Sequence, residues 1–197
     1  MRKALMAAAA ILAALVVVGM LAGDDDKGAE EDEDAAAEVL AVGVTPEEAG
    51  CTEVEHSQLP AESAKHVTGT VEWPDEPPNQ GDHSPNTLRN VTRFYEREHT
   101  PAPEQAVHNL EHGIVVAWYD TELPDEEVEA LREAITAYPT PRVMAVPWDR
   151  SVFEGGRHVV LTAWGHAQRC ARVSGRVVYD FARTYADKDA PEKGYSV

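Results

Sequence analysis

The chain has 197 residues and a formal net charge of −18, with 43% hydrophobic and 26% charged residues. This composition is typical of a soluble globular protein, since a disordered chain would contain fewer apolar residues at this charge. The acidic surface would repel phosphate backbones and anionic lipid headgroups, so we expect no nucleic-acid partner and no charge-driven docking to a membrane.

The N-terminus combines two cations, Arg2 and Lys3, with an unbroken apolar run from Ala4 to Ala22. The length of this run lies between that of a signal-peptide core and that of a membrane span of roughly 20 residues. Residues 1–23 are therefore predicted to be a signal anchor, with the membrane as its partner, or a cleaved signal peptide. Because the cations stay in the cytoplasm, the rest is expected to face outward, as a single-pass cell-membrane protein or a secreted one.

Residues 24–50 hold more than half of the net negative charge and little that a core could bury. Like charges repel, so we predict an acidic disordered linker that holds the next segment away from the membrane. A weak cation-gathering tail is the alternative, although the ligand spacing of a calcium loop is absent. Residues 51–197 are then expected to form a single extracytoplasmic domain.

Cys51 and Cys170 are the two cysteines of the chain. In an oxidising compartment two cysteines usually pair, and this bond would close a long loop. The absence of a C-x-x-C motif argues against a redox role. Metal-binding thiolates are the alternative to this structural disulfide.

Alternation and apolar runs predict the elements of the domain in chain order. Two helices are expected from their one-sided apolar spacing, and the first also has acidic residues in its first turn. Between the first two strands lies a long segment rich in proline and polar residues. The predicted strands are 67–73, 114–119, 142–146 and 158–164, the helices are 125–138 and 177–185, and the long loop is 75–104.

From Ile114 onward the predicted order is strand, helix, strand, strand, helix. A right-handed crossover would make the first two of these strands parallel. The short Gly155-Gly156 connection suggests that the third strand pairs antiparallel with the second. We therefore predict an α+β fold, or a small α/β fold, with a compact mixed sheet closed by the disulfide.

Histidines carry the main chemical signal of the sequence. His108 and His112 are four residues apart, which places both rings on one face of either a helix or a strand. His83 lies in a turn-rich loop and His66 precedes the first predicted strand. Imidazoles from such a set suit zinc, copper or nickel. We predict a transition-metal site formed by His83, His108 and His112, with His66 as a further candidate ligand. The remaining histidines, His56, His99, His158 and His166, are expected to be surface or packing residues.

The stretch from His108 to His112 also matches H-x-x-E-H, a pattern in which two histidines hold zinc and the glutamate activates water. That chemistry needs a helix through His112, whereas Gly113 and the β-branched residues after it should end a helix at once. Glu111 is therefore expected to support the metal site by orienting an imidazole. Metal-dependent hydrolysis stays open as an alternative.

Several short motifs resemble the bacterial family catalogued as domain of unknown function 3105. The most specific is Leu110-Glu111-His112-Gly113, and the others are Gly50-Cys51, His66-Val67, Gly81-Asp82-His83, Trp118-Tyr119, Ala163-Trp164-Gly165 and Cys170. The resemblance spans roughly residues 51–185. It implies a secreted or membrane-anchored protein with one outward-facing domain and a cysteine pair, and it names no reaction.

Three functions are consistent with these patterns. The first is an extracytoplasmic domain that binds a transition metal, zinc or copper. The second is a cell-envelope interaction module without metal, which would bind a protein partner through the surface around Trp73 and the proline-rich loop. The third is a metallohydrolase of the H-x-x-E-H type with Glu111 as its base. The sequence leaves open whether the protein is an enzyme.

Overall fold

The computed structural model describes residues 43–57, 59, 64–149 and 154–194, all within one compact unit. The predicted anchor or signal peptide lies outside these residues, as does the linker up to residue 42. Within the described part of the chain, no helix is both long and apolar enough to cross a membrane.

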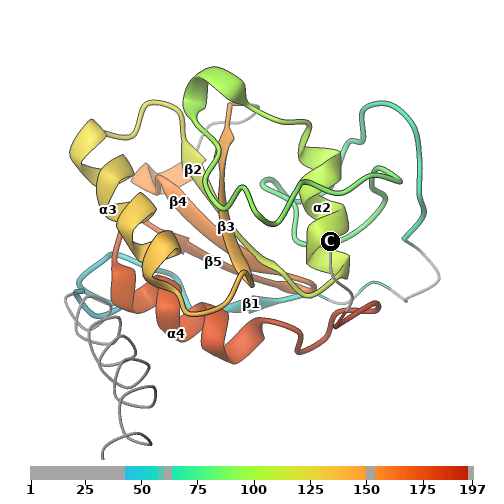
Figure 1. The fold of residues 1–197 in the computed structure, drawn as a ribbon. Helices are drawn as coiled ribbons and strands as arrows, with labels where there is room; N and C mark the ends of the chain where they lie inside the picture. Colours follow the sequence, from blue (N-terminus) through green and yellow to red (C-terminus); the bar gives the residue numbers. More distant parts are fainter. Residues whose placement is uncertain (1–42, 58, 60–63, 150–153, 195–197) are drawn as a thin grey trace, which may run out of the picture. The chain divides into compact units, whose positions relative to one another are not determined.

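The described residues form three α-helices around a five-stranded mixed sheet (Figure 1). This α+β fold agrees with the fold class expected from the sequence. The strand order across the sheet is β1-β5-β4-β2-β3, with β2 and β3 parallel and the other pairs antiparallel. The elements are β1 (Glu55–His56), α2 (Pro103–Glu111), β2 (Val115–Asp120), α3 (Asp125–Ala137), β3 (Val143–Trp148), β4 (Val159–Ala163), β5 (His166–Cys170) and α4 (Gly175–Tyr185).

The parallel crossover from β2 through α3 to β3 confirms the predicted connection. The predicted partner of the next strand was wrong, because β4 pairs with β2 and not with β3. The outer edge of β3 is instead occupied by the segment around Phe94, which forms an isolated parallel bridge with Ala145. Ala145 already uses its N–H to bind the Arg93 carbonyl there, and Pro147, two residues further on, has no N–H to offer.

The strand predicted at residues 67–73 is also absent. Thr68 and Gly69 form a bend and the rest of this segment has no regular structure, while its neighbour His66 makes only an isolated bridge with His83. Trp73 is the last apolar residue of the alternating pattern. Its ring N–H donates to the Asp82 carbonyl, so its side chain packs against the loop. Side-chain packing against a loop therefore replaces strand pairing here.

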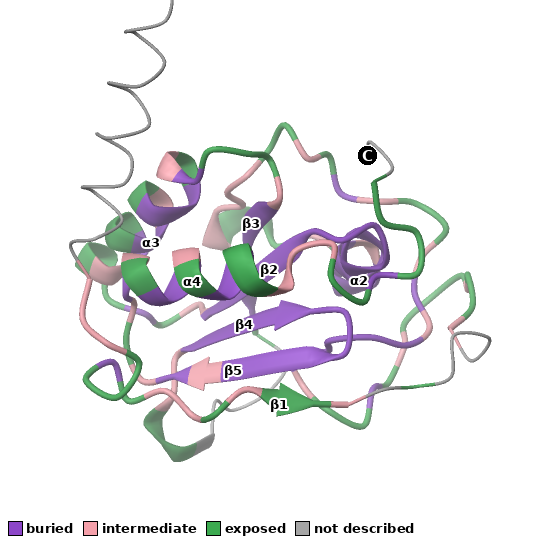
Figure 2. Cartoon of the chain, turned by 90° about the horizontal axis from the view of Figure 1, so that it is seen from below, coloured by how far each residue is buried: buried purple, intermediate pink, exposed green. Residues whose placement is uncertain are grey.

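Two apolar layers enclose the sheet, because successive strand residues point to opposite faces. Val115, Ala117 and Tyr119 of β2 pack with residues of α3 and α4, whereas Val116 and Trp118 pack with residues of α2. Figure 2 shows that β2, β4 and β5 are buried along most of their length and that β1 is an exposed edge. The α2 layer carries the candidate site.

The disulfide between Cys51 and Cys170 is formed, as predicted, and joins residues 119 apart in sequence. It ties the start of the domain to the end of β5. Beside it, Ala49 is 1% exposed and its carbonyl accepts the N–H of Ala171. The last residues of the expected linker therefore pack against the domain.

Candidate metal centre

Helix α2 supplies His108 and Glu111, which are three residues apart and share one face. The helix begins at Pro103. Proline lacks a backbone N–H, and the first N–H of a helix has no partner within the helix, so no hydrogen bond is lost there. It ends at Glu111 because Gly113 adopts a φ of +86° and its N–H binds the Leu110 carbonyl. Such a left-handed glycine is a common helix terminator. The early end of the helix leaves His108 and Glu111 on its last turns.

Asn109 fixes α2 to the preceding loop. Its fully buried side chain accepts the N–H of Leu88 at 2.8 Å and donates to the carbonyl of Leu88 at 2.9 Å. Both polar groups of the amide are thus satisfied by one residue of the loop. This pairing holds the loop after His83 against the helix.

The loop residues that position His83 lie on its N-terminal side. Gly81 adopts a φ of +111°, which a residue with a side chain rarely takes, and the ring N–H of Trp73 holds the next carbonyl, that of Asp82, at 3.1 Å. His83 itself is 1% exposed. Its backbone pairs with the segment around His66, so the rings of His66 and His83 lie 4.9 Å apart.

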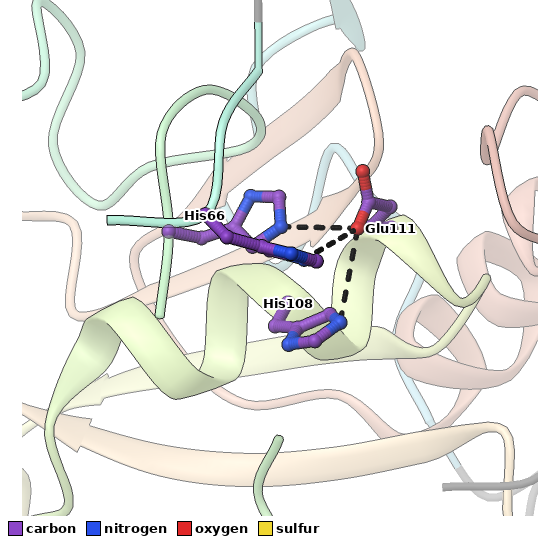
Figure 3. Close-up of side chains that lie close together, drawn as sticks. His66, His108 and Glu111 are labelled. Carbon is purple, nitrogen blue, oxygen red and sulfur yellow. Dashed lines mark ion pairs between the residues drawn. The ribbon is translucent and has the colours of Figure 1, made fainter. Parts of the chain in front are cut away.

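Three imidazoles converge on one carboxylate oxygen. Oε2 of Glu111 lies 3.0 Å from Nε2 of His83, 3.7 Å from Nε2 of His66 and 3.8 Å from Nε2 of His108. Figure 3 shows the rings of His66 and His108 directed at this oxygen, one from the loop and one from α2. We call His66, His83, His108 and Glu111 the His3Glu group; His66 is half exposed and the other three are buried.

The hydrogen bonds of His83 define which ring nitrogen is free to bind. Nδ1 lies 2.8 Å from the Gly81 carbonyl, which can only accept, so Nδ1 carries the proton. In the neutral ring Nε2 is then an acceptor, and it faces another acceptor, Oε2 of Glu111. Both atoms are buried, and neither has an aligned hydrogen bond among the described residues. Two such atoms 3.0 Å apart require a cation, either a proton or a metal ion.

The members of the His3Glu group differ in how their surroundings shift their pKa values. Burial lowers the pKa of His108 to about 4, helped by the neighbouring imidazoles, so this ring is neutral at pH 7. Burial also acts on His83, but the Glu111 carboxylate and the Gly81 carbonyl outweigh it and raise the pKa of His83. Burial would raise the pKa of Glu111, yet the adjacent imidazoles hold it below its usual value. A neutral imidazole beside an ionised carboxylate is the state that binds a metal.

The size of the group also fits a metal ion. One ligand atom from each residue lies within 4.8 Å of all the others. Four ligands about 2.1 Å from a tetrahedral ion lie roughly 3.4 Å apart. Oε2 of Glu111 is already 3.0 to 3.8 Å from the three imidazole nitrogens, whereas the widest pair of ligand atoms would have to close by up to roughly 1.4 Å.

Residues 66–197 match the sequence model of a family described as "Protein of unknown function (DUF3105)". This region is more than half of the chain and contains the whole His3Glu group. The chain belongs to this family. Comparison with curated proteins and with solved structures finds no match in either set. The DUF3105 region begins at His66, later than the resemblance in the sequence suggested, so Cys51 precedes it.

His112 lies beside the His3Glu group of this DUF3105 domain but is not one of its four members. It forms the C-cap of α2, and its ring stacks on the ring of His108, with the ring centres 4.8 Å apart. Its Nε2 lies 3.1 Å from Nε2 of His108 and 3.8 Å from a carboxylate oxygen of Glu192. Glu111 takes the fourth position in the group. The spacing of three between His108 and Glu111 was the available signal for this.

The other four histidines of the DUF3105 chain lie elsewhere. His99 is exposed in a short 3-10 helix, and His158 contacts a carboxylate oxygen of Asp120 at 2.9 Å. His56 and His166 face each other across β1 and β5. None of these four belongs to the His3Glu group.

Proposed function

We propose that the domain binds one transition-metal ion through the His3Glu group. The observation that carries the proposal is the pair of buried acceptors, Nε2 of His83 and Oε2 of Glu111, held 3.0 Å apart. The Gly81 carbonyl fixes the proton of His83 on the opposite nitrogen, which is the support that metal-binding histidines usually have. A cation between the two atoms turns an unfavourable contact into a bond.

The donor set favours zinc or copper(II). Three imidazoles and one carboxylate suit these borderline ions, whereas a site for copper(I) would usually include sulfur. Both cysteines are occupied in the disulfide. A tetrahedral zinc ion accepts four such ligands once their atoms close around it.

A closed set of four protein ligands favours binding over hydrolysis. Catalytic zinc sites keep a position open for water, while structural sites use four protein ligands. In the hydrolase alternative, Glu111 would stand back from the metal as a base. Its Oε2 instead lies among the imidazole nitrogens, at 3.0 to 3.8 Å. Hydrolysis would require Glu111 to leave this position.

We further propose that this domain is extracytoplasmic, on a membrane anchor or secreted. A disulfide is stable in oxidising compartments and rare in the reducing cytosol. The Cys51–Cys170 bond supports such a compartment, and the cationic and apolar N-terminus supplies the route of export.

The second candidate is the cell-envelope interaction module without metal. Its supporting observation is a groove of about 410 Å³ beside the loop that carries His83, lined by Leu59, Trp73, Pro74 and Pro78 among others. In this case the cation between His83 and Glu111 is a proton, and the cluster is a polar core feature. Metal content separates the two candidates.

The test is a calorimetric titration of the tag-free full-length chain with Zn²⁺ and with Cu²⁺. We expect one tight equivalent that is lost in His83→Ala and retained in His99→Ala, a control that removes an exposed histidine outside the group. Equal affinity in the wild type and in His83→Ala would contradict the metal site and leave the interaction module as the better reading.

A further inference from the structure

A second histidine pair lies on the edge of the sheet. His56 of β1 and His166 of β5 are direct partners in the antiparallel register, so their side chains leave the same face of the sheet. Their Nδ1 atoms lie 2.7 Å apart. His56 is exposed and His166 is 4% exposed. One member of the pair is therefore open to solvent, and the other is fixed in the fold.

Asp189 defines the protonation of the buried member. Its Oδ2 lies 2.6 Å from Nε2 of His166. The ionised carboxylate can only accept, so the ring donates from Nε2. In neutral His166 the lone pair is then on Nδ1, the atom that faces His56. A carboxylate behind an imidazole is the usual support of a metal-binding histidine.

Packing limits the movement of His166. Its ring lies 4.5 Å from the ring of Tyr185, and Tyr185 packs in turn on Phe181 at 4.7 Å. The orientation of the Nδ1 lone pair is thus set by α4 as well as by Asp189. His56 lacks such confinement, since its ring is 6.2 Å from that of Tyr185. The exposed ring can turn to admit an ion.

We propose that His56 and His166 form a second site for a divalent transition metal, separate from the His3Glu group. The ion is of the class that prefers imidazole, such as Zn²⁺, Ni²⁺ or Cu²⁺. Both Nδ1 atoms bind it, Asp189 holds His166 in place, and water completes the coordination. Two ligands 2.1 Å from one ion lie roughly 3.0 to 3.4 Å apart. A small rotation of His56 provides this separation.

Two protein ligands bind more weakly than four, so this site fills after the His3Glu group. His158 offers a matched comparison, because it also pairs with a carboxylate, that of Asp120, and is partly exposed. Among the residues that the structure describes, its ring nitrogen contacts this carboxylate and no second imidazole. Removing His158 should leave metal binding unchanged.

The experiment is equilibrium dialysis of the tag-free full-length chain against Zn²⁺ alone. We expect two equivalents in the wild type and in His158→Gln, and loss of the weaker equivalent in His56→Gln. Asp189→Asn should retain the weaker equivalent with roughly 10- to 100-fold lower affinity, the usual effect of losing such a support. The acidic segment at residues 24–34 is the same in every variant. Any zinc bound by this segment is therefore equal in all of them and does not affect the difference between variants.

Retention of the weaker equivalent in His56→Gln, or a single equivalent in the wild type, would overturn the second site. His56 is exposed on an edge strand, so its replacement should not disturb folding; circular dichroism without metal checks this. The Glu111→Gln variant distinguishes the two proposals, because it should lose the tight equivalent and keep the weaker one. Nitrogen couplings from two imidazoles in the electron paramagnetic resonance spectrum of Cu²⁺ bound to Glu111→Gln, lost when His56→Gln is added, give an independent readout of the pair.

Discussion

Glu111 holds one carboxylate oxygen 3.0 Å from Nε2 of His83, and the two residues come from a helix and from a separate loop. Neither atom has an aligned hydrogen bond within the described residues. Without a cation, the contact would leave two buried acceptors facing each other, which costs free energy. This contact between Glu111 and His83 is therefore the basis of the first prediction about the site.

Glu111→Gln should weaken zinc binding while preserving the shape of the side chain. The substitution removes the negative charge on which three imidazoles converge. We expect a loss of affinity larger than the roughly 10- to 100-fold that follows removal of a supporting residue. Competition with a chelator of known affinity measures it, and His99→Gln is the control. A loss below 10-fold would show that Glu111 is not a ligand.

The metal-free domain should lose stability as the pH falls below about 6.5. Burial lowers the pKa of His108 to about 4, whereas an unfolded chain keeps the ordinary value of 6.5. Between these values the unfolded state binds more protons at this position, so acid favours unfolding. The loss due to His108 approaches the order of 3 kcal/mol at pH 4.

Urea unfolding in the presence of a chelator, from pH 7.5 to pH 4.5, measures this dependence. The pKa of His83 is raised and that of Glu111 is lowered, so these groups also contribute, with opposite signs. Both remain in His108→Gln, so the difference between the two curves reports the loss of His108 together with its coupling to these two groups. Parallel curves would show that His108 titrates normally in the folded state.

Gly113→Ala should destabilise the domain and reduce zinc affinity. Gly113 has a φ of +86°, and a Cβ there would collide with Asp187, so the end of α2 that carries Glu111 would shift. Gly69→Ala is the matched control, because Gly69 also has a positive φ, +100°, but a Cβ there meets nothing within 4 Å. Both variants should lose about 1 kcal/mol or more from backbone strain. Chemical unfolding should show a larger loss for Gly113→Ala, and equal losses would exclude the collision.

Removing the disulfide should cost a large share of the stability. The Cys51–Cys170 bond closes a loop of 119 residues in sequence separation. In the chain-entropy model, a closure of this size contributes roughly 4 to 5 kcal/mol. The double variant Cys51→Ser with Cys170→Ser should therefore unfold at a much lower urea concentration, as should the reduced wild type. An unchanged midpoint in both proteins would mean that packing alone holds the two segments together.

The sequence predicts β2, β3, β4, α3 and α4 well, because their apolar patterns are strong, but it does not predict α2, the helix that carries the candidate site. The run before Tyr119 is buried on both faces of β2, and the one-sided spacing of Leu131 and Ile135 matches α3. The pattern is weaker in β5, where His166, Gln168 and Arg169 interrupt the apolar residues. Polar partners on neighbouring segments satisfy these side chains, and a single sequence does not reveal those partners. This is why β5 and its pairing with β4 are absent from the sequence prediction.

For the candidate site, residue type and spacing each gave part of the signal. His66, His83 and His108 are all candidate ligands in the sequence, and the structure brings them together. The interval of four residues gave His112 more weight than Glu111. The interval does bring His112 against His108, with 3.1 Å between their Nε2 atoms, so His112 stays a predicted ligand that the group of four does not include. The meeting of His66 with His83 depends on loop pairing that no periodic pattern encodes.

The unequal exposure of the His3Glu group has a kinetic consequence. His83 is 1% exposed and His108 is 6% exposed, whereas 49% of the His66 side chain faces solvent. In the proposed metal site, an ion would therefore exchange most easily by releasing His66 first, with an incoming donor taking its place. His66 would act as the exchangeable ligand while the buried ligands retain the ion.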